Sequence, residues 1–550
     1  MVASLVKKGL TAFVSKQTNI FTAASFIILT TIFSQILGIL KYRLLVSLFG
    51  ASQELGVFFA AFRIPDFVFQ VVIAGALSSS FIPIFADFIS RDKKQEGFEF
   101  SSTLITMGLV FYIFVSAVII VFSYQLASIV APGFSQSELR LMANLMIIIQ
   151  LAQVFFILGT IFTAMLQSFQ HFVIPGLASA FYNFGIILGL IIFSHFLGVG
   201  IYGATIGVLI GAIFFSLIQL PLLAVTGFRF SPSFALTPGI DKLFRLMVPR
   251  SLTVIISQIA ATANVFFASF LSARSLVIFD LAHTLAMAPV LLLGQSIAQA
   301  SFPALSLKSG DRREFLSILT SSFNQILYLT LPISALLIVL RIPLVRLFYG
   351  ASRFDWEATV ETGLTLAYFA IAITANALIA LLSRAFYAFK DSKTPFIITS
   401  ITVAINIFLS YLFILTYQLP IYFLAFSFST SSIVGVVLMA FLLNKRIELP
   451  KIEIMVSSAK IIISTIVMGA ALYIPIKLLD QLVFDTTRTV GLLALTGIAS
   501  AAGFASYIFF TWLLDIKEAY YVIRVLKKFG QKDKILKGLN EIIGGPKFNG

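Results

Sequence analysis

Charged residues are scarce in this chain of 550 residues. Asp, Glu, Lys and Arg together make up 11% of the sequence, whereas soluble domains contain about 25%. So few charges cannot cover a water-exposed surface, which excludes an ordinary soluble domain. Hydrophobic residues make up 59% of the chain. They recur in long apolar stretches from end to end, so we predict an integral membrane protein.

Cysteine is absent and histidine is rare. The lack of cysteine excludes disulfides, a thiolate nucleophile and an iron–sulfur site. The three histidines, His171, His195 and His283, are too far apart in sequence for a local metal motif. No glycine-rich phosphate loop ending in Lys-Ser/Thr is present, which argues against an ATP-driven pump. No nucleophile–base pattern stands out, so we predict a protein that is not an enzyme and has no cofactor.

The apolar stretches predict an all-α membrane fold of about fourteen transmembrane helices. Each stretch is long enough to cross about 30 Å of hydrocarbon as a helix. The expected spans are 21–42, 56–86, 101–124, 139–165, 173–196, 200–225, 246–271, 275–302, 318–340, 362–384, 395–416, 420–443, 459–479 and 489–514.

The distribution of basic residues predicts the topology. An even number of spans puts both termini on one side, and 28 of the 38 Lys and Arg residues fall on that side. The positive-inside rule then places both termini in the cytoplasm. The net charge of +15 is explained by this topology, so we expect no nucleic-acid partner. The basic amphipathic tail at 515–550 favours a helix on the anionic leaflet, with a partner-binding tail as the alternative.

The sequence repeats itself at a constant separation. Pro83 and Pro303 each precede a charged loop, Pro175 and Pro395 each begin a span, and the two pairs have the same spacing. Six spans separate the matched points, so the copies have the same orientation, as in transporters that rock two halves around a central site. The predicted domains are a basic flank at 1–20, an N-lobe at 21–228 (spans one to six), a C-lobe at 229–443 (spans seven to twelve), two extra spans at 444–514 and the tail at 515–550.

Several ionisable residues fall inside predicted spans, where they are costly and usually functional. They are Lys41 and Arg43 at the end of span one, Arg63 and Asp66 in span two, Arg250 in span seven, and Asp280 and His283 in span eight. Two alternatives stay open. Lys41 can snorkel to the membrane interface, and Arg63 and Asp66 can neutralise each other at i,i+3 spacing.

Spans two and eight are also the irregular ones. We predict hinges at Pro65 and Gly75 in span two and at Pro289 and Gly294 in span eight, because Pro breaks the helical hydrogen-bond ladder. Such kinked, polar helices are candidate walls of a central cavity. Span six differs: its glycines at four-residue spacing, Gly203, Gly207 and Gly211, indicate close helix packing.

A set of short strings resembles the MurJ (MviN) family of lipid II flippases, which belongs to the multidrug, oligosaccharidyl-lipid and polysaccharide exporter superfamily. The strings are collinear over spans one to twelve. They include Phe33-Ser34-Gln35-Ile36-Leu37-Gly38, Phe58-Phe59-Ala60-Ala61-Phe62-Arg63-Ile64-Pro65, Ala131-Pro132-Gly133-Phe134 and Ala385-Phe386-Tyr387.

The resemblance implies an alternating-access exporter of an undecaprenyl-linked, anionic peptidoglycan precursor in the bacterial cytoplasmic (inner) membrane. It implies contact with membrane lipids and leaves open a partnership with cell-wall synthesis enzymes. It also implies a cationic cavity that holds the diphosphate, to which Lys41, Arg63, Asp66, Gln35, Gln70, Asp280 and His283 are the candidate contributors.

The chain departs from the family pattern at charged positions. Lys41 keeps the charge of a family arginine, whereas other charged positions of the family are occupied by Gln35, Gly56, Phe69, Gln70, Ala74, His283 and Thr284. The acids through which some members bind sodium match Asn264, Asn406 and Ser410, so a sodium site is doubtful and the coupling to an ion or to the membrane potential stays open.

Three functions remain open after this comparison. The first is a lipid II flippase with a charge-depleted cavity. The second is an exporter of another lipid-linked glycan or amphiphile, and the third is a transport-inactive membrane scaffold for cell-wall synthesis. A diphosphate in a low-dielectric cavity needs compensating cations, so the charges that remain decide between these functions.

Overall fold

The computed structural model describes residues 20–71, 81–235, 238–479 and 489–520, and every regular element in these ranges is a helix. The chain forms two compact units. The first holds residues 1–278, 348–358 and 414–418, and the second holds 279–347, 359–413 and 419–550. The predicted all-α membrane class is therefore confirmed. The predicted flank at 1–20, apart from Ile20, and most of the tail lie outside the described residues.

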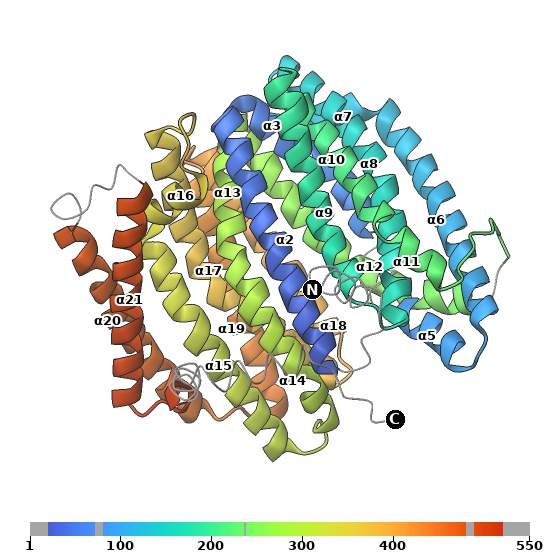
Figure 1. Ribbon diagram of the computed structural model, residues 1–550. Coiled ribbons are helices and arrows are strands. Elements are labelled where there is room, and N and C mark those ends of the chain that lie inside the picture. The colour runs from blue at the N-terminus through green and yellow to red at the C-terminus, as the bar shows by residue number, and fades with distance from the viewer. Residues whose placement is uncertain (1–19, 72–80, 236–237, 480–488, 521–550) are drawn as a thin grey trace, which may run out of the picture. The chain divides into compact units, whose positions relative to one another are not determined.

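The helices of the first unit run from α2 to α12 and into the start of α13 (Figure 1). They are α2 (Ile20–Phe49), α3 (Gln53–Ala61), α4 (Arg63–Phe69), α5 (Ile82–Ser90), α6 (Lys94–Val121), α7 (Ser123–Val130), α8 (Gln136–Ser168), α9 (Val173–Gly189), η3 (Leu190–Phe196), α10 (Ile201–Leu217), α11 (Leu220–Val225) and α12 (Pro238–Ser269).

Most of the remaining helices belong to the second unit. They are α13 (Ala273–Pro289), η4 (Val290–Gln295), α14 (Ser296–Leu307), α15 (Arg312–Val339), α16 (Arg341–Tyr349), α17 (Trp356–Ala388), α18 (Lys393–Ser410), η5 (Tyr411–Thr416), α19 (Tyr422–Ile447), α20 (Lys451–Leu479) and α21 (Thr489–Leu513).

Twelve helices in the described ranges are long and apolar enough to cross a membrane. They correspond to the predicted spans other than two and seven. The described part of span two is divided at Phe62 into α3 and α4, and α5 begins at Ile82, after residues that lie outside the described ranges. Span seven lies in α12, whose first half carries Asp241 and Lys242, and its apolar second half, Val254–Ser269, is too short to count among the twelve. The count of fourteen stays a prediction.

Helix boundaries recur along the chain at the spacing of the sequence repeat. The offset between the starts of α8 and α17 equals the offset between their ends, and it is the same as the offset between Pro83 and Pro303. The starts of α9 and α18 also differ by this offset, and both helices pass into short π-helical segments, η3 and η5. The stretches from α8 to η3 and from α17 to η5 therefore have the same succession of helices.

The chain ends these helices with matching hydrogen bonds. After α8, Gln170 has a φ of +64°, and the His171 N–H donates to the Leu166 carbonyl at 2.9 Å. After α17, Lys390 has a φ of +60°, and the Asp391 N–H donates to the Phe386 carbonyl at 3.0 Å. In both turns a residue with left-handed backbone ends the helix, and the N–H of the next residue donates to a carbonyl of the last helical turn.

The starts of the same two helices are also capped by side chains at equivalent positions of the repeat. The Glu138 N–H donates to Ser135 Oγ at 3.4 Å, and the Ser135 N–H donates to Glu138 Oε2 at 2.8 Å, which is a capping box. At α17 the Ala358 N–H donates to Asp355 Oδ1 at 2.7 Å. The equivalent helix α17 is therefore capped by an Asp side chain, whereas α8 begins with a Ser–Glu capping box.

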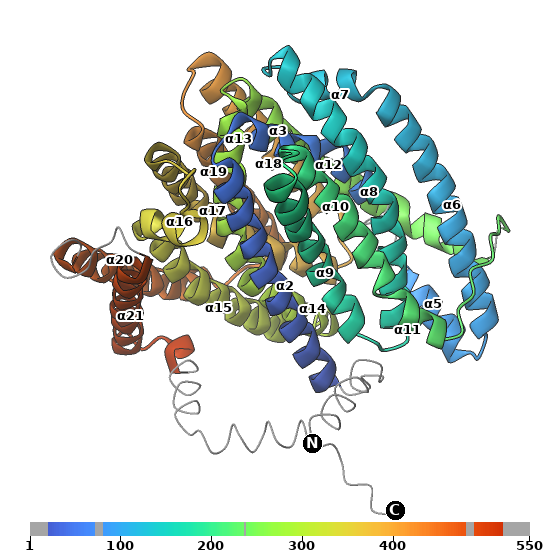
Figure 2. The same ribbon diagram turned by 45° about the horizontal axis from the view of Figure 1, so that its top comes forward.

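Glycines bring α9 and α10 into backbone contact, as predicted from their spacing in span six. A Cβ added at Gly211 would lie 2.4 Å from the Tyr182 carbonyl oxygen, and one at Gly189 would lie 2.3 Å from Gly207 Cα. The two helices lie side by side in Figure 1 and Figure 2. The predicted close packing is confirmed, and it follows the small-residue rule of membrane helices.

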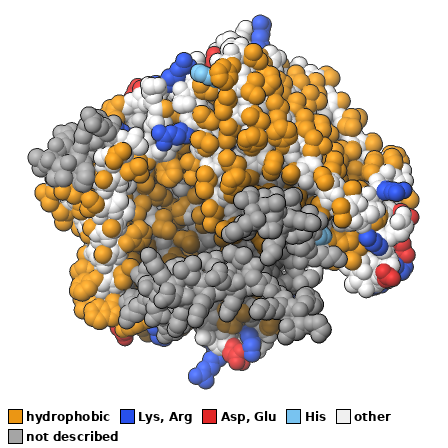
Figure 3. Space-filling model, viewed as in Figure 1, with side chains coloured by type: hydrophobic (Ala, Val, Ile, Leu, Met, Phe, Trp, Pro, Cys, Tyr) orange, Lys and Arg blue, Asp and Glu red, His pale blue; other side chains and the backbone are white. Residues whose placement is uncertain are grey.

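Large apolar side chains are exposed along many of the long helices. Figure 3 shows one face of the molecule, on which hydrophobic side chains predominate over charged ones. Examples are Phe114 on α6, Phe408 on α18, Ile466 on α20 and Phe509 on α21. Exposed apolar side chains on so many long helices are typical of a protein surrounded by lipid.

The residues that follow α21 include a partly buried acid. Burial raises the pKa of the Glu518 carboxyl, while its own backbone N–H and Lys517 oppose this shift. Because the folded pKa lies above the unfolded one, the folded state binds the proton more tightly, and stability falls as the pH rises through the folded pKa. The ionised carboxylate therefore destabilises the fold at pH values above this range.

We expect Glu518→Gln to raise the thermal unfolding temperature of the detergent-solubilised protein at pH 8, and to have little effect below the ordinary Glu pKa of about 4.3. Unfolding would be followed at both pH values, with Glu314→Gln on the exposed start of α15 as the control. A variant that is less stable than the unmodified protein at pH 8 would show that the carboxylate is stabilising instead.

Candidate functional site

Lys41 lies on α2 in an aromatic environment. Its side chain is half-buried, and its Nζ lies 4.6 Å from the ring centroid of Tyr42 and 6.0 Å from that of Tyr182 on α9. Both distances are within the range of cation–π attraction. Arg43, two residues later, is exposed, as is Gln35, nearly two turns earlier. The first unit therefore packs Lys41 against two aromatic rings.

Arg63 and Asp66 lie on α4, which begins where α3 ends. The chain leaves α3 at Phe62, so Pro65 falls in the first turn of α4, where its missing N–H breaks no helical bond. The Asp66 Oδ1 accepts a hydrogen bond from Gln153 Nε2 at 3.0 Å. Arg63 forms no ion pair with a described residue, and its buried Nε has no hydrogen-bond partner among them.

Arg63 and Asp66, whose i,i+3 spacing would allow an ion pair, therefore have different environments. Asp66 is bound to α8 through Gln153, and Arg63 keeps a buried donor without an acceptor among the described residues. Gln70, one turn after Asp66, is half-buried at the start of a π-helical stretch. The arrangement leaves a guanidinium group able to bind an anion.

A neighbouring polar cluster was not predicted. Gln150 on α8 is fully buried, and its Nε2 donates to Tyr112 Oη at 2.8 Å and to Ser116 Oγ at 2.9 Å, both on α6. Gln150 and Gln153 are one turn apart, so α8 presents two amides on one face. Two glutamines at this spacing inside an apolar span were the signal that sequence reasoning missed.

Asp280 and His283 lie on α13 in the second unit, and both are half-buried. The His283 ring is surrounded by aromatic residues: its centroid lies 6.2 Å from that of Phe279, 5.2 Å from Phe369 on α17 and 6.0 Å from Phe428 on α19. These rings pack around the His283 side chain from α13, α17 and α19. Asp280 lies one turn before His283 on the same helix.

The helix is irregular where span eight was predicted to bend. α13 ends at Pro289 and is followed by the π-helical segment η4. Gly294 in η4 packs on α17, since a Cβ added there would lie 2.4 Å from the Ala377 Cβ. A short π-helical segment marks a local change in the hydrogen-bond ladder, and such segments are frequent at functional sites. The remaining predicted hinge, Gly75 in span two, lies outside the described residues.

Gly56 stands where the resemblance described above implies an acid, and the structure gives the position a steric role. A Cβ added at Gly56 on α3 would lie 1.7 Å from the Ala273 carbonyl oxygen at the start of α13. At the same end of the first unit, the Gly133 N–H donates to Ser269 Oγ at 3.1 Å. Glycine allows backbones to approach this closely, so an acid cannot occupy position 56 without movement of the chain.

The positions that match the family's sodium ligands are neutral and differ in their chemistry. Asn264 Oδ1, Asn406 Nδ2 and Ser410 Oγ are buried atoms without hydrogen-bond partners among the described residues. The orphaned atom of Asn406 is a donor, which would repel a cation. None of the three supplies the negative charge that offsets the cost of burying a cation. These residues do not fit a sodium site, and the described ranges contain no cluster of three or more His, Asp or Glu side chains that could hold a metal ion.

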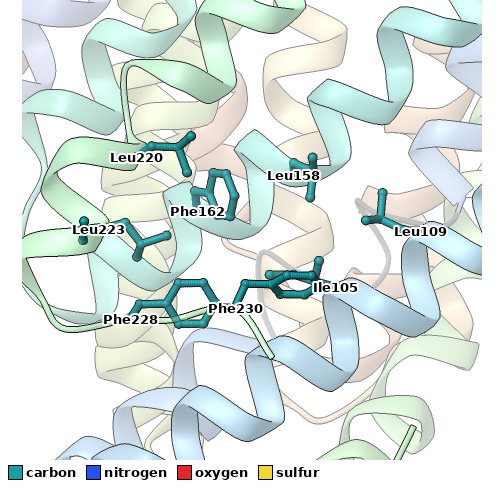
Figure 4. A pocket seen from close by; sticks show the side chains of 9 residues that line it. Ile105, Leu109, Leu158, Phe162, Leu220, Leu223, Phe228 and Phe230 are labelled. Carbon is teal, nitrogen blue, oxygen red and sulfur yellow. The ribbon is translucent and has the colours of Figure 1, made fainter. Parts of the chain in front are cut away.

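The first unit also contains an apolar pocket of about 400 Å³ (Figure 4). Its walls come from α6, α8, α11 and the segment after α11, and include Ile105, Phe162, Leu223 and Phe230. All nine lining residues are apolar. A diphosphate cannot be held there without a compensating cation, so this pocket is not the site of the charged group.

Comparisons with known proteins place the chain in a family. A model of the family described as lipid II flippase MurJ matches residues 45–491. The chain is 28% identical over 499 residues to a probable lipid II flippase MurJ from Thermotoga maritima, covering 90% of this chain and 97% of the relative. It is 28% identical over 390 residues to a lipid II flippase MurJ from Burkholderia cenocepacia, covering 68% and 75%.

Solved structures show the same fold. A structure of lipid II flippase MurJ in an inward closed conformation matches with a TM-score of 0.74 and 24% identity, over 88% of this chain and 98% of that one. An inward-facing MATE-family multidrug resistance transporter of the MOP superfamily matches with a TM-score of 0.63 and 15% identity, over 78% and 98%. Because the family model covers most of its length, the chain belongs to the lipid II flippase MurJ family.

Proposed function

We propose that this protein flips an undecaprenyl-linked peptidoglycan precursor across the bacterial inner membrane by alternating access. Family membership supports the transport of lipid II, the cargo named for its relatives. The cavity of this chain carries fewer charges than the family pattern, so the remaining polar groups must supply more of the contact with the diphosphate.

Arg63 is the observation that carries the proposal. Its Nε is buried in the first unit without a hydrogen-bond partner among the described residues. A buried, unsatisfied donor on a charged group is costly, and phosphate oxygens are acceptors that fit the planar guanidinium. We infer that Arg63 donates to the diphosphate and that Lys41, half-buried between two tyrosine rings, supplies the second cation.

The other candidate residues have supporting roles in this proposal. Asp66 orients α4 through Gln153, while Gln35 and Gln70 donate to neutral oxygens of the cargo. In the second unit, Asp280 and His283 stay candidates for polar contacts with the cargo. Pro65, Gly75, Pro289 and Gly294 act as hinges of the two irregular spans.

Two other functions are kept because of the charges that this chain has lost. An exporter of another lipid-linked glycan or amphiphile would need fewer cations. A transport-inactive scaffold for cell-wall enzymes would need none. The neutral residues at Gln35, Phe69 and Thr284 favour these alternatives, whereas the buried Nε of the half-buried Arg63 favours an anionic cargo.

Reconstitution tests the cargo directly. The purified protein would be placed in vesicles that contain a fluorescent lipid-linked precursor, and a membrane-impermeant reagent would measure the fraction in the outer leaflet over time. We expect faster exchange of the diphosphate-linked precursor than of an ordinary phospholipid with the same label. Equal exchange of both lipids, or exchange no faster than in empty vesicles, would contradict the proposal.

We further propose that both termini lie in the cytoplasm, since 28 of the 38 basic residues fall on their side of the predicted topology. A reporter that works only in the cytoplasm should be active when fused after Gly550, and a reporter that works only outside should be silent there. The opposite result would require an odd number of spans or an inverted orientation.

A further inference from the structure

The second unit contains a polar cavity of about 610 Å³ that the proposed transport does not use. It lies between α15, α20 and residues 515–518, which follow α21, and α20 packs against both other helices. In Figure 1 and Figure 2, α20 and α21 lie side by side. α15 and α20 begin at this cavity and α21 ends at it, so it opens at the membrane surface.

Two polar stripes form the facing walls of the cavity. Along each helix the polar residues are three or four positions apart, which puts them on one face. They are Arg313, Ser317, Thr320 and Asn324 on α15, and Glu453, Ser457 and Lys460 on α20. A polar face that extends about three turns into an otherwise apolar span needs a polar partner.

The deepest part of the α15 stripe lacks such a partner. Thr320 and Asn324 are both buried, at 6% and 9% exposure. Thr320 Oγ1 and Asn324 Oδ1 have no hydrogen-bond partners among the described residues. Buried polar atoms are rarely left unsatisfied in folded proteins, so these two point to a ligand in the cavity.

The charges around the opening are balanced. The cations are Arg313, Lys460 and Lys517, and the anions are Glu453, Asp515 and Glu518. No salt bridge joins any two of them within the described ranges, and Lys460 Nζ instead donates to the Leu514 carbonyl at 2.8 Å. Charges of both signs around one cavity, without salt bridges between them, match a ligand that itself carries one positive and one negative group.

The surroundings of the opening are those of a lipid. On α20, Ile452, Met455 and Val456 are exposed next to Glu453, and Val456 also lines the cavity. Exposed apolar side chains beside a charged opening at the end of transmembrane helices suit acyl chains below a headgroup. Acyl chains attached to a headgroup in the cavity would therefore meet apolar side chains at its opening.

We propose that this cavity binds the headgroup of a zwitterionic phospholipid, phosphatidylethanolamine, from the leaflet on the side of the chain termini. Arg313 and Lys460 bind the phosphate, and Glu453 and Glu518 accept hydrogen bonds from the ammonium. Asn324 Oδ1 and Thr320 Oγ1 complete the polar contacts of the headgroup, directly or through water. The bound lipid would tie α20 and α21 to α15, apart from the cargo site.

Native mass spectrometry of the full-length protein in detergent tests the site by titration with three lipids of equal chain length. Phosphatidylethanolamine presents a phosphate and a hydrogen-bonding ammonium. Phosphatidylcholine keeps both charges but its ammonium cannot donate, and phosphatidylglycerol lacks the positive charge. We expect phosphatidylethanolamine to bind about tenfold more tightly than either, the effect of one charge-assisted hydrogen bond.

Two variants at the exposed mouth localise the binding. Arg313→Gln and Glu453→Gln should each weaken phosphatidylethanolamine binding about tenfold. Glu314→Gln should not, because Glu314 is next to Arg313 but pairs with Lys308 outside the cavity. Thermal unfolding without lipid checks that each variant is folded, and the comparison of lipids on the unmodified protein does not depend on the variants.

Three results would overturn the proposal. One is equal binding of all three lipids, and another is a preference for phosphatidylglycerol. The third is binding of soluble phosphoethanolamine as tight as that of the lipid, which would assign the cavity to a soluble zwitterion. Because lipid binding is measured without transport, its failure leaves the flippase proposal untouched, and failure of flipping leaves the lipid site untouched.

Discussion

Lys41→Ala is expected to abolish flipping, whereas Lys41→Arg retains part of it. By its resemblance to the family, the chain keeps a cavity cation at Lys41 and has neutral Gln35 and Gln70 at other positions where that resemblance implies charges. With fewer cations sharing the compensation of a diphosphate, each contributes more. Loss of one buried ionic contact costs about 3–5 kcal/mol, which corresponds to more than about a hundredfold in binding. Arg preserves the charge but changes the geometry of hydrogen bonding.

Arg43→Ala is the matched control for this experiment. Arg43 lies two residues from Lys41 on the same helix, and its side chain is exposed. Flipping would be measured in cells that rely on each variant, with protein levels compared by immunoblot. If Lys41 only reaches the membrane interface, both alanine variants will be equally active, and that result would remove Lys41 from the cargo site.

Gly56→Ala is expected to cause the second large loss, through packing. The added Cβ would lie 1.7 Å from the Ala273 carbonyl oxygen and 2.4 Å from its carbonyl carbon. Both are backbone atoms, so neither can rotate away, and α3 has to separate from the start of α13. Overpacking of this kind costs about 1–3 kcal/mol or more. Gly56→Asp, which restores the acid of the family, adds a charge to the same clash.

Gly108→Ala is the control, because a Cβ added there meets nothing within 4 Å. This replacement should be neutral or slightly stabilising, since Ala is favoured over Gly in a helix by about 1 kcal/mol. Thermal unfolding in detergent and growth of cells that depend on the variant would be compared for both positions. A Gly56→Ala protein as stable and as active as Gly108→Ala would show that the contact at Ala273 is not required.

The long helices could be predicted because lipid imposes one requirement on every span. Backbone groups in hydrocarbon must bond within their own helix, so an apolar stretch of sufficient length indicates a span. The span predicted at 139–165 is found as Gln136–Ser168, extended by the capping box at Ser135 that hydropathy does not register. The π-helical segments η3, η4 and η5 were not predicted, because no clear amino-acid composition distinguishes a segment with i→i+5 hydrogen bonds from one with i→i+4 hydrogen bonds.

The site was harder to predict, because its chemistry depends on partners from other helices. The spacing of Arg63 and Asp66 suggested mutual neutralisation, and the pairing of Asp66 with Gln153 could not be predicted from sequence. Gly56 was recognised as a lost charge, but its contact with Ala273, on a helix far away in the sequence, gives the position its physical meaning. Local periodicity identifies faces of helices and does not identify what each face meets.

The most direct test of the account is replacement of a cell's own flippase by this protein. The resident flippase would be depleted, and the amount of lipid-linked precursor accessible to an impermeant reagent on the outer face would be measured. The account predicts continued growth and precursor on the outer face, with loss of both in the Lys41→Ala variant. Accumulation of precursor on the inner face, despite normal levels of the unmodified protein in the membrane, would contradict it.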